Sequence, residues 1–203
     1  MQMIIFLLLI LFVLFIISLF SSEKFSPIPY FPTNKKDIPA IIKALKLRND
    51  QIIFDLGAGN GIVIFEAAKK AINLNTQFVA IDINPVLILI MHLRRLLHPN
   101  RKNIKIIWND MFKINLDVIA KLSLNSDSEA LPKLKQSNEK RLLRFARNDI
   151  TIYLYISPWL LEKTVSKIKK NINKFSLVSY FYPIKSLKKR EKIIKGRNNI
   201  YIY

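Results

Sequence analysis

The sequence predicts an α/β fold, in which a mostly parallel sheet carries helices on both faces. Strand-like and helix-like segments alternate along most of the 203 residues, a pattern typical of parallel sheets. A turn containing Gly57, Gly59 and Gly61 separates the first of these strands from its helix. The acidic residues Asp55 and Asp82 stand where the first two strands end. Because the carboxyl ends of parallel strands share one edge of a sheet, we expect a ligand site at that edge.

Hydrophobic periodicity defines the individual elements. Short apolar runs bounded by turn residues predict strands, and apolar residues three or four positions apart predict helices. Asn84-Pro85 starts one helix, since proline in a first turn removes no hydrogen bond. The expected strands cover residues 52–54, 77–83, 104–108, 151–156, 176–182 and 200–203, and the last two are joined by a basic connector, 185–197. The expected helices cover 37–47, 62–71, 86–97 and 160–172.

The spacing of the glycines indicates the kind of ligand. A dinucleotide fingerprint has the form G-x-G-x-x-G, with the pyrophosphate at the helix N-terminus. Here the pattern from Asp55 to Gly61 is D-x-G-x-G-x-G. A carboxylate ahead of the glycines would repel a pyrophosphate but would suit a ligand that carries an ammonium group. The motif therefore favours S-adenosylmethionine over NAD, and the alternative is a plain glycine turn before a helix.

Two further acidic positions are candidate binding residues. Asp82, at the end of the second strand, is placed to accept the two hydroxyls of a ribose, unless it is only a loop carboxylate. Asn109 and Asp110 close the third strand, and in the expected sheet this end lies by the adenine. Asp110 would accept the adenine amino group there, and the alternative is a surface turn.

The N-terminal residues 1–22 form a separate segment. Residues 3–20 are an apolar run interrupted only by Ser18, and as a helix they would reach roughly 27 Å, close to the hydrocarbon thickness of a bilayer. We expect an uncleaved single-pass membrane anchor rather than a signal peptide, because no basic residue precedes the run. All 33 Lys and Arg follow it, which predicts that the rest of the chain lies on the cytoplasmic side of the cytoplasmic membrane. Residues 23–50 are then a juxtamembrane segment with a lead-in helix, capped by Thr33 or Asn34.

Composition bounds the partners. The chain has no Cys, which excludes disulfides and thiolate metal sites, and its two His have no acid at ligand spacing, so no metal is expected. The net charge of +19 is consistent with nucleic acid or an anionic membrane surface as partner. The alternative is a bias toward lysine throughout the chain, since the lysines are dispersed. Within the domain expected at 51–203, residues 117–150 are polar and aperiodic, and we interpret them as a low-order insertion.

Five short segments carry a family resemblance. They are Pro29-Tyr-Phe-Pro-Thr33, the glycine motif ending at Gly61, Ile83-Asn-Pro85, Asp110-Met-Phe-Lys113 and Ser157-Pro158-Trp159. With the N-terminal apolar run, they resemble the membrane-anchored class I S-adenosylmethionine-dependent protein-lysine methyltransferases that act on the ATP synthase c subunit and the adenine nucleotide carrier. The resemblance spans the chain except for 117–150, which is longer than the family's connector. It implies a Rossmann-like methyltransferase fold and a small membrane protein as substrate.

The resemblance also implies roles for individual residues. Gly57, Gly59, Asn60 and Gly61 would shape the cofactor bed, and Asp55 would hold the methionyl ammonium. The cofactor-binding set is completed by Asp82, Asn109 and Asp110. The catalytic set would be Tyr30, Thr33, Ser157, Pro158 and Trp159, with Tyr30, Tyr155 and Trp159 as candidates for an aromatic slot around the acceptor lysine.

Two other functions stay open. One is an RNA methyltransferase, which the positive charge permits. The segment Ser157-Pro158-Trp159 differs from the Asn/Asp-Pro-Pro-Tyr/Phe of enzymes that act on planar amino groups, and this disfavours transfer to adenine N6. The other is a cofactor-binding membrane protein without turnover.

Overall fold

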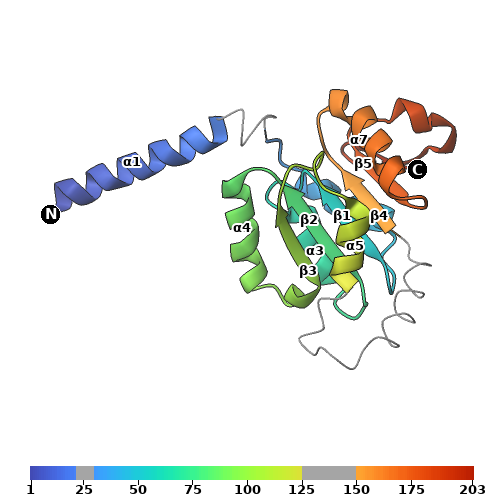
Figure 1. Ribbon diagram of the computed structural model, residues 1–203, viewed down its shortest axis with the longest axis horizontal. Coiled ribbons are helices and arrows are strands. Elements are labelled where there is room, and N and C mark those ends of the chain that lie inside the picture. The colour runs from blue at the N-terminus through green and yellow to red at the C-terminus, as the bar shows by residue number, and fades with distance from the viewer. Residues whose placement is uncertain (22–29, 125–149) are drawn as a thin grey trace.

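The computed structural model describes residues 1–21, 30–124 and 150–203. Its centre is a seven-stranded sheet in the order β3-β2-β1-β4-β5-β7-β6 (Figure 1). The strands are β1 Ile52–Leu56, β2 Gln77–Asp82, β3 Ile104–Trp108, β4 Ile150–Leu154, β5 Ser176–Tyr180, β6 Lys192–Lys195 and β7 Asn199–Ile202. β1 to β5 run parallel, and β7 runs antiparallel between β5 and β6. The strand order reverses between β1 and β4, so a crevice is expected at the carboxyl ends of these two strands.

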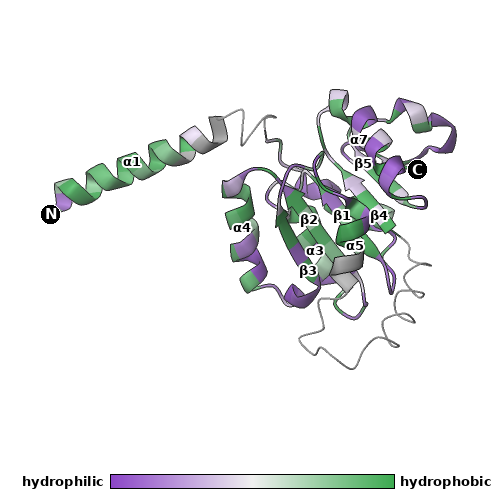
Figure 2. Ribbon diagram, viewed as in Figure 1, coloured by the Kyte–Doolittle hydropathy of each residue, from purple (hydrophilic) through white to green (hydrophobic). Residues whose placement is uncertain are grey.

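Helices cover both faces of the sheet. The α-helices are α1 Gln2–Ser21, α2 Ile38–Leu45, α3 Ile62–Lys70, α4 Pro85–Leu96, α5 Leu116–Leu124 and α7 Pro158–Asn171, and the short 3-10 helices are η1 Lys35–Asp37, η2 Arg101–Asn103 and η3 Lys185–Arg190. One apolar cluster joins α2, α3 and α4 to the sheet, and a second joins α5 and α7 to its other face. β1 is buried along its whole length, as a strand covered on both sides must be. Its apolar residues, like those of its neighbours, appear green in Figure 2.

The structure confirms the α/β class and most of the expected elements, with ends displaced by a few residues. Two expectations were wrong. The basic connector 185–197 contains η3 and the edge strand β6, because β6 alternates Lys with Ile and needs only one partner strand, β7. The expected insertion 117–150 begins within α5, whose Leu116 and Ala120 are buried against the sheet. Residues 125–149 lie outside the described residues, as do 22–29 of the expected juxtamembrane segment.

The N-terminal helix α1 projects from the domain on the side of α4 (Figure 1), and its described side chains are exposed. Figure 2 shows that it is apolar along most of its length. Within the described residues, however, no helix meets the length and apolarity that crossing a bilayer requires. The expected transmembrane anchor at 1–22 is therefore not supported.

A buried carboxylate, Asp37, joins the start of the domain to its end. Its oxygens accept hydrogen bonds from the Tyr180 hydroxyl at 2.7 Å, the Arg197 amide at 2.5 Å and the Asn198 amide at 3.0 Å. Gly196 has no room for a Cβ, which would meet Asp37 Oδ1. Burial alone raises the pKa of Asp37, but these hydrogen bonds outweigh burial and hold it below its ordinary value.

Replacing Asp37 with Asn should destabilise the domain. The amide cannot accept all of these hydrogen bonds, so we expect the free energy of unfolding at pH 7 to fall by about 2 kcal/mol. The depressed pKa means that Asp37 stabilises the fold above its unfolded pKa, and that this contribution is lost as pH falls through its folded pKa. Urea unfolding at several pH values measures both effects. The gap between Asp37→Asn and the unaltered protein should narrow in acid, whereas exposed Glu66→Gln should change stability little.

Candidate functional site

The glycine loop after β1 is built from backbone that side chains rarely adopt. Gly57, Gly59 and Gly61 have φ angles of +82°, +58° and +74°, and this left-handed region penalises a Cβ. The amides of Gly57 and Ala58 donate to the carbonyl of Ile81 in β2, at 2.9 and 3.0 Å. The loop is therefore held against the end of the neighbouring strand before α3 begins.

Two of the glycines are also required by close packing. A Cβ on Gly59 would lie 2.7 Å from the ring of Tyr30. A Cβ on Gly61 would lie 2.8 Å from the Phe65 ring and 2.9 Å from Met91. Gly61 is the N-cap of α3 and packs against Met91 of α4. Tyr30 covers Gly59 from the cavity side.

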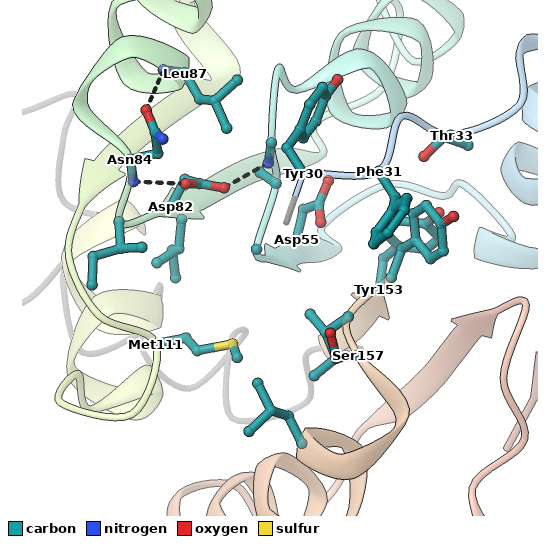
Figure 3. Close-up of a pocket in the computed structure, with 18 of the residues that line it drawn as sticks. Tyr30, Phe31, Thr33, Asp55, Asp82, Asn84, Leu87, Met111, Tyr153 and Ser157 are labelled. Carbon is teal, nitrogen blue, oxygen red and sulfur yellow. Dashed lines mark hydrogen bonds between the residues drawn. The ribbon is translucent and has the colours of Figure 1, made fainter. Parts of the chain in front are cut away.

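Asp82 holds this loop in place through a hydrogen bond (Figure 3). One carboxylate oxygen accepts the Gly59 amide at 2.7 Å, and the other accepts the Asn84 amide at 2.8 Å. Burial raises the pKa of Asp82, and the hydrogen bonds from Asn84, Gly59 and Ile83 oppose that rise. A carboxylate has about four acceptor positions, so Asp82 can still accept hydrogen bonds from ligand hydroxyls.

Asp55 is the acid whose charge is the more costly to bury. It is only 2% exposed at the end of β1, between Asp82 and Tyr153 in Figure 3. Burial raises its pKa well above the ordinary value, and the charge of Asp82 raises it further. A cationic group bound beside Asp55 would relieve both costs, so the site is suited to a ligand that places an ammonium there.

A cavity of about 630 Å³ opens above the loop, at the carboxyl ends of β1 and β4. This volume is within the range of small-molecule sites. Of the residues expected to bind or react, all but Gly61 line it: Tyr30, Thr33, Asp55, Gly57, Gly59, Asn60, Asp82, Asn109, Asp110, Ser157, Pro158 and Trp159. The structure therefore brings together segments from residue 30 to residue 159 at one place, while their chemical roles stay predictions.

Aromatic side chains make up a large part of the cavity wall. Tyr30, Phe31, Tyr155, Tyr182 and Trp159 line it, and Trp159 is 71% exposed at the start of α7. Burial raises the pKa of both Tyr30 and Tyr155, so both hydroxyls stay neutral near pH 7. Aromatic faces attract cations and exclude water, which makes such a lining suitable for an amine substrate.

At the end of β3, Asn109 and Asp110 form a turn. The Asn109 amide donates to the Asp82 carbonyl at 3.0 Å, and its side-chain oxygen accepts the Asp110 amide at 2.8 Å. Asp110 Oδ1 accepts the Phe112 amide at 2.8 Å. Lys167 of α7 donates to the Phe112 carbonyl, so this turn is also held against α7. Both residues line the cavity while their side chains shape the turn.

Some lining residues were not expected. Tyr153 lies within the apolar strand β4, and Asn84 was expected only as the residue that starts α4. Asn84 does cap that helix, because its Oδ1 accepts the amides of Val86 and Leu87 at 2.9 and 3.2 Å. Its position two residues after the strand-ending acid is the one signal that could have indicated a second role. For Tyr153 the strand pattern contains no such signal.

Comparison with known proteins supports the fold. No known family profile matches the chain. A segment of 42 residues is 40% identical to a protein-lysine N-methyltransferase of Saccharolobus islandicus, and the match covers 21% of this chain and about a quarter, 26%, of that relative.

Two solved structures resemble the whole domain. An RNA methyltransferase of Salinibacter ruber, in complex with S-adenosyl-L-homocysteine, has a TM-score of 0.55 at 15% identity over 85% of this chain and 92% of its own. A precorrin-6y C5,15-methyltransferase of Geobacter metallireducens has a TM-score of 0.52 at 16% identity over 89% and 94%. At these identities the likeness concerns the fold, and it confirms the expected Rossmann-like class I methyltransferase fold.

Removing the charge of Asp55 should stabilise the ligand-free protein. The raised pKa means that the folded state binds this proton more tightly than the unfolded state, so Asp55 costs stability progressively as pH rises from its unfolded pKa through its folded pKa. We expect Asp55→Asn to raise the free energy of unfolding by about 1 kcal/mol at high pH, which shifts the melting midpoint by roughly 3 °C. Thermal unfolding from pH 5 to pH 9 measures this gain. A gain that does not grow with pH, or one that Glu66→Gln reproduces, would contradict the assignment.

Proposed function

We propose that the chain is an S-adenosylmethionine-dependent methyltransferase that methylates a lysine side chain of a protein. The observation that carries the proposal is the cavity itself, in which a glycine loop, two buried acids and several aromatic side chains meet at the switch point of the sheet. The glycine loop would lie along the cofactor. The two acids would bind the cofactor's ammonium and its ribose, and the aromatic side chains would surround the incoming amine.

The residues present fit the cofactor. A cation beside Asp55 would offset the cost of burying its charge, and the ammonium of the methionine moiety is such a cation. Asp82 retains acceptor positions for the ribose hydroxyls. Gly57 and Gly59, whose backbone is left-handed, line the cavity, so the loop can bring its backbone close to a ligand. Asn109 and Asp110 border the cavity beside Asp82, where the adenine would follow the ribose.

When bound, the cofactor would supply a methyl group on a sulfonium, which is transferred in line to a nucleophile. The protein then has to align a neutral amine and keep water away. Burial among Tyr30, Tyr155 and Trp159 would lower the pKa of an acceptor lysine and so favour its neutral form. The proton that this lysine carries in solution would pass to water as the side chain enters, so no general base is required within the slot.

The choice of lysine rests on two supports. One is the aromatic lining of the cavity, and the other is the short segment shared with a protein-lysine N-methyltransferase. The net charge of +19 is what favours RNA as the acceptor. Because charge alone gives only non-specific attraction, we favour lysine and treat RNA as an outcome of the test.

Transfer assays with labelled cofactor separate these functions. Purified protein is incubated with methyl-labelled S-adenosylmethionine and with protein or RNA from cells that lack the gene. We expect label in protein, recovered as methyl-lysine, and a loss of at least tenfold in Asp82→Ala, with Glu66→Gln unaffected. Label in RNA would favour the other acceptor. Cofactor binding by calorimetry without any transfer would indicate a binding protein, and absence of binding would refute the proposal.

We also propose that the domain works at a membrane surface. The support is α1, whose exposed apolar side chains include Leu8, Phe12 and Phe15. α4, on the same side of the domain, exposes Leu89 and Leu93 at helical spacing. Covering exposed apolar side chains with lipid lowers the free energy of the system. The cytoplasmic side of the membrane stays a prediction, as does a small membrane protein as substrate.

Changing the apolar surface of α1 should release the protein from lipid. Leu8→Glu combined with Phe12→Glu alters only exposed side chains, so the domain should keep its melting temperature. Flotation with vesicles of phosphatidylcholine and phosphatidylglycerol should show most of the unaltered protein with the vesicles and most of the double variant free. Ile193→Glu, an exposed change on β6, serves as the matched control. Equal flotation of both variants would contradict the proposal.

A further inference from the structure

Two polar groups in the cavity wall are buried without hydrogen-bond partners. Among the described residues, Asn84 Nδ2 and the Tyr153 hydroxyl are the buried side-chain atoms in this condition, and both residues line the cavity. An unsatisfied buried donor costs free energy comparable to a lost hydrogen bond. Such groups are therefore candidates for contact with a ligand.

The orientation of Asn84 is fixed by the helix that it caps. Its Oδ1 accepts the amides of Val86 and Leu87, so the amide plane cannot turn over without losing both hydrogen bonds. Its Nδ2, on a side chain that is 2% exposed, is left over as a donor beside Asp82, whose carboxylate holds the Asn84 backbone amide. The donor thus lies next to the acid assigned to the ribose.

Tyr153 occupies the corresponding place beside the other acid. It is directly paired with Asp55 across β1 and β4, and it is 1% exposed. Burial raises the pKa of Tyr153 well above its ordinary value, and the charge of Asp55 adds to this, so the hydroxyl keeps its proton. The side chain of Thr33 approaches and lowers that pKa, yet it does not complete a hydrogen bond to the hydroxyl.

The two donors therefore lie at separate parts of the cavity, each beside one acid (Figure 3). An acid and a neutral donor side by side form a site for a group that both donates and accepts. Next to Asp55 such a group is an amino-acid zwitterion, with its ammonium toward the acid and its carboxylate toward the hydroxyl. Next to Asp82 it is a nucleoside, whose hydroxyls donate and whose oxygen and ring nitrogen atoms accept.

We infer that Asn84 and Tyr153 are binding residues that divide the cofactor between them: the Asn84 amide donates to the nucleoside half, and the Tyr153 hydroxyl donates to the methionine carboxylate. This inference rests on the proposed function. It assigns to two side chains a task that the sequence pattern did not predict, and it explains why neither donor has a partner within the protein.

Two ligands and two variants test the division. S-adenosylhomocysteine contains both halves, whereas 5′-methylthioadenosine lacks the amino-acid end. Asn84→Ser keeps an oxygen to cap α4 but removes the amide donor, and Tyr153→Phe removes only the hydroxyl. Calorimetry should show that Asn84→Ser weakens both ligands by a similar factor, roughly five- to tenfold. Tyr153→Phe should weaken S-adenosylhomocysteine about tenfold or more and leave 5′-methylthioadenosine within twofold, since a hydrogen bond to a charged group is the stronger kind.

Other patterns overturn the inference. If Tyr153 has only a structural role, Tyr153→Phe would change the melting temperature and weaken the affinity for both ligands equally. If Asn84 has only a structural role, Asn84→Ser would change the melting temperature and leave the affinity for both ligands unaltered. If Asn84→Ser fails to fold, Asn84→Asp keeps the cap and should also weaken both ligands, because it replaces the donor by a second acceptor. If the unaltered protein binds neither ligand, the proposed function fails first. If it binds both ligands, but Asn84→Ser weakens neither of them or Tyr153→Phe weakens both alike, only the inference fails.

Discussion

The two hydrogen bonds accepted by Asp82 hold the rest of the site in place. One fixes the glycine loop after β1, and the other fixes the residue that starts α4. The carbonyl of the same residue accepts the Asn109 amide, which places the turn after β3. Three neighbouring strand ends are therefore tied to one residue. Arg94 of α4 adds a fourth connection, since it donates to the Asn60 carbonyl at 3.0 Å.

This arrangement concentrates negative charge where little water can reach it. Asp55 and Asp82 are both buried, and each carries a pKa above its ordinary value. A fold selected only for stability would not place two acids together in this way. A cation and hydroxyls bound in the cavity would recover the free energy that the ligand-free domain loses here, so under the proposed function the same electrostatic cost would become binding selectivity.

Much of this site could be predicted from the sequence because its determinants are local. The glycines at 57, 59 and 61 need left-handed backbone, and a strand-ending acid is visible from its neighbours alone. The unpaired Tyr153 hydroxyl could not be predicted, because it depends on which side chains the pairing of β1 and β4 brings within hydrogen-bond distance. The edge strand β6 was missed since lysine-rich sequence resembles a solvated connector until β7 is known to pair with it. The role of Asp37 depends on partners about 160 residues away, a separation that no local pattern reports.

That separation has a consequence for how the chain matures during synthesis. Asp37 emerges from the ribosome about 160 residues before the amides of Arg197 and Asn198 that hydrogen-bond to it. Until those amides have been synthesised, the Asp37 carboxylate lacks these partners and must be solvated by water. The contacts that join the two segments can therefore form only after the chain has been made as far as Asn198.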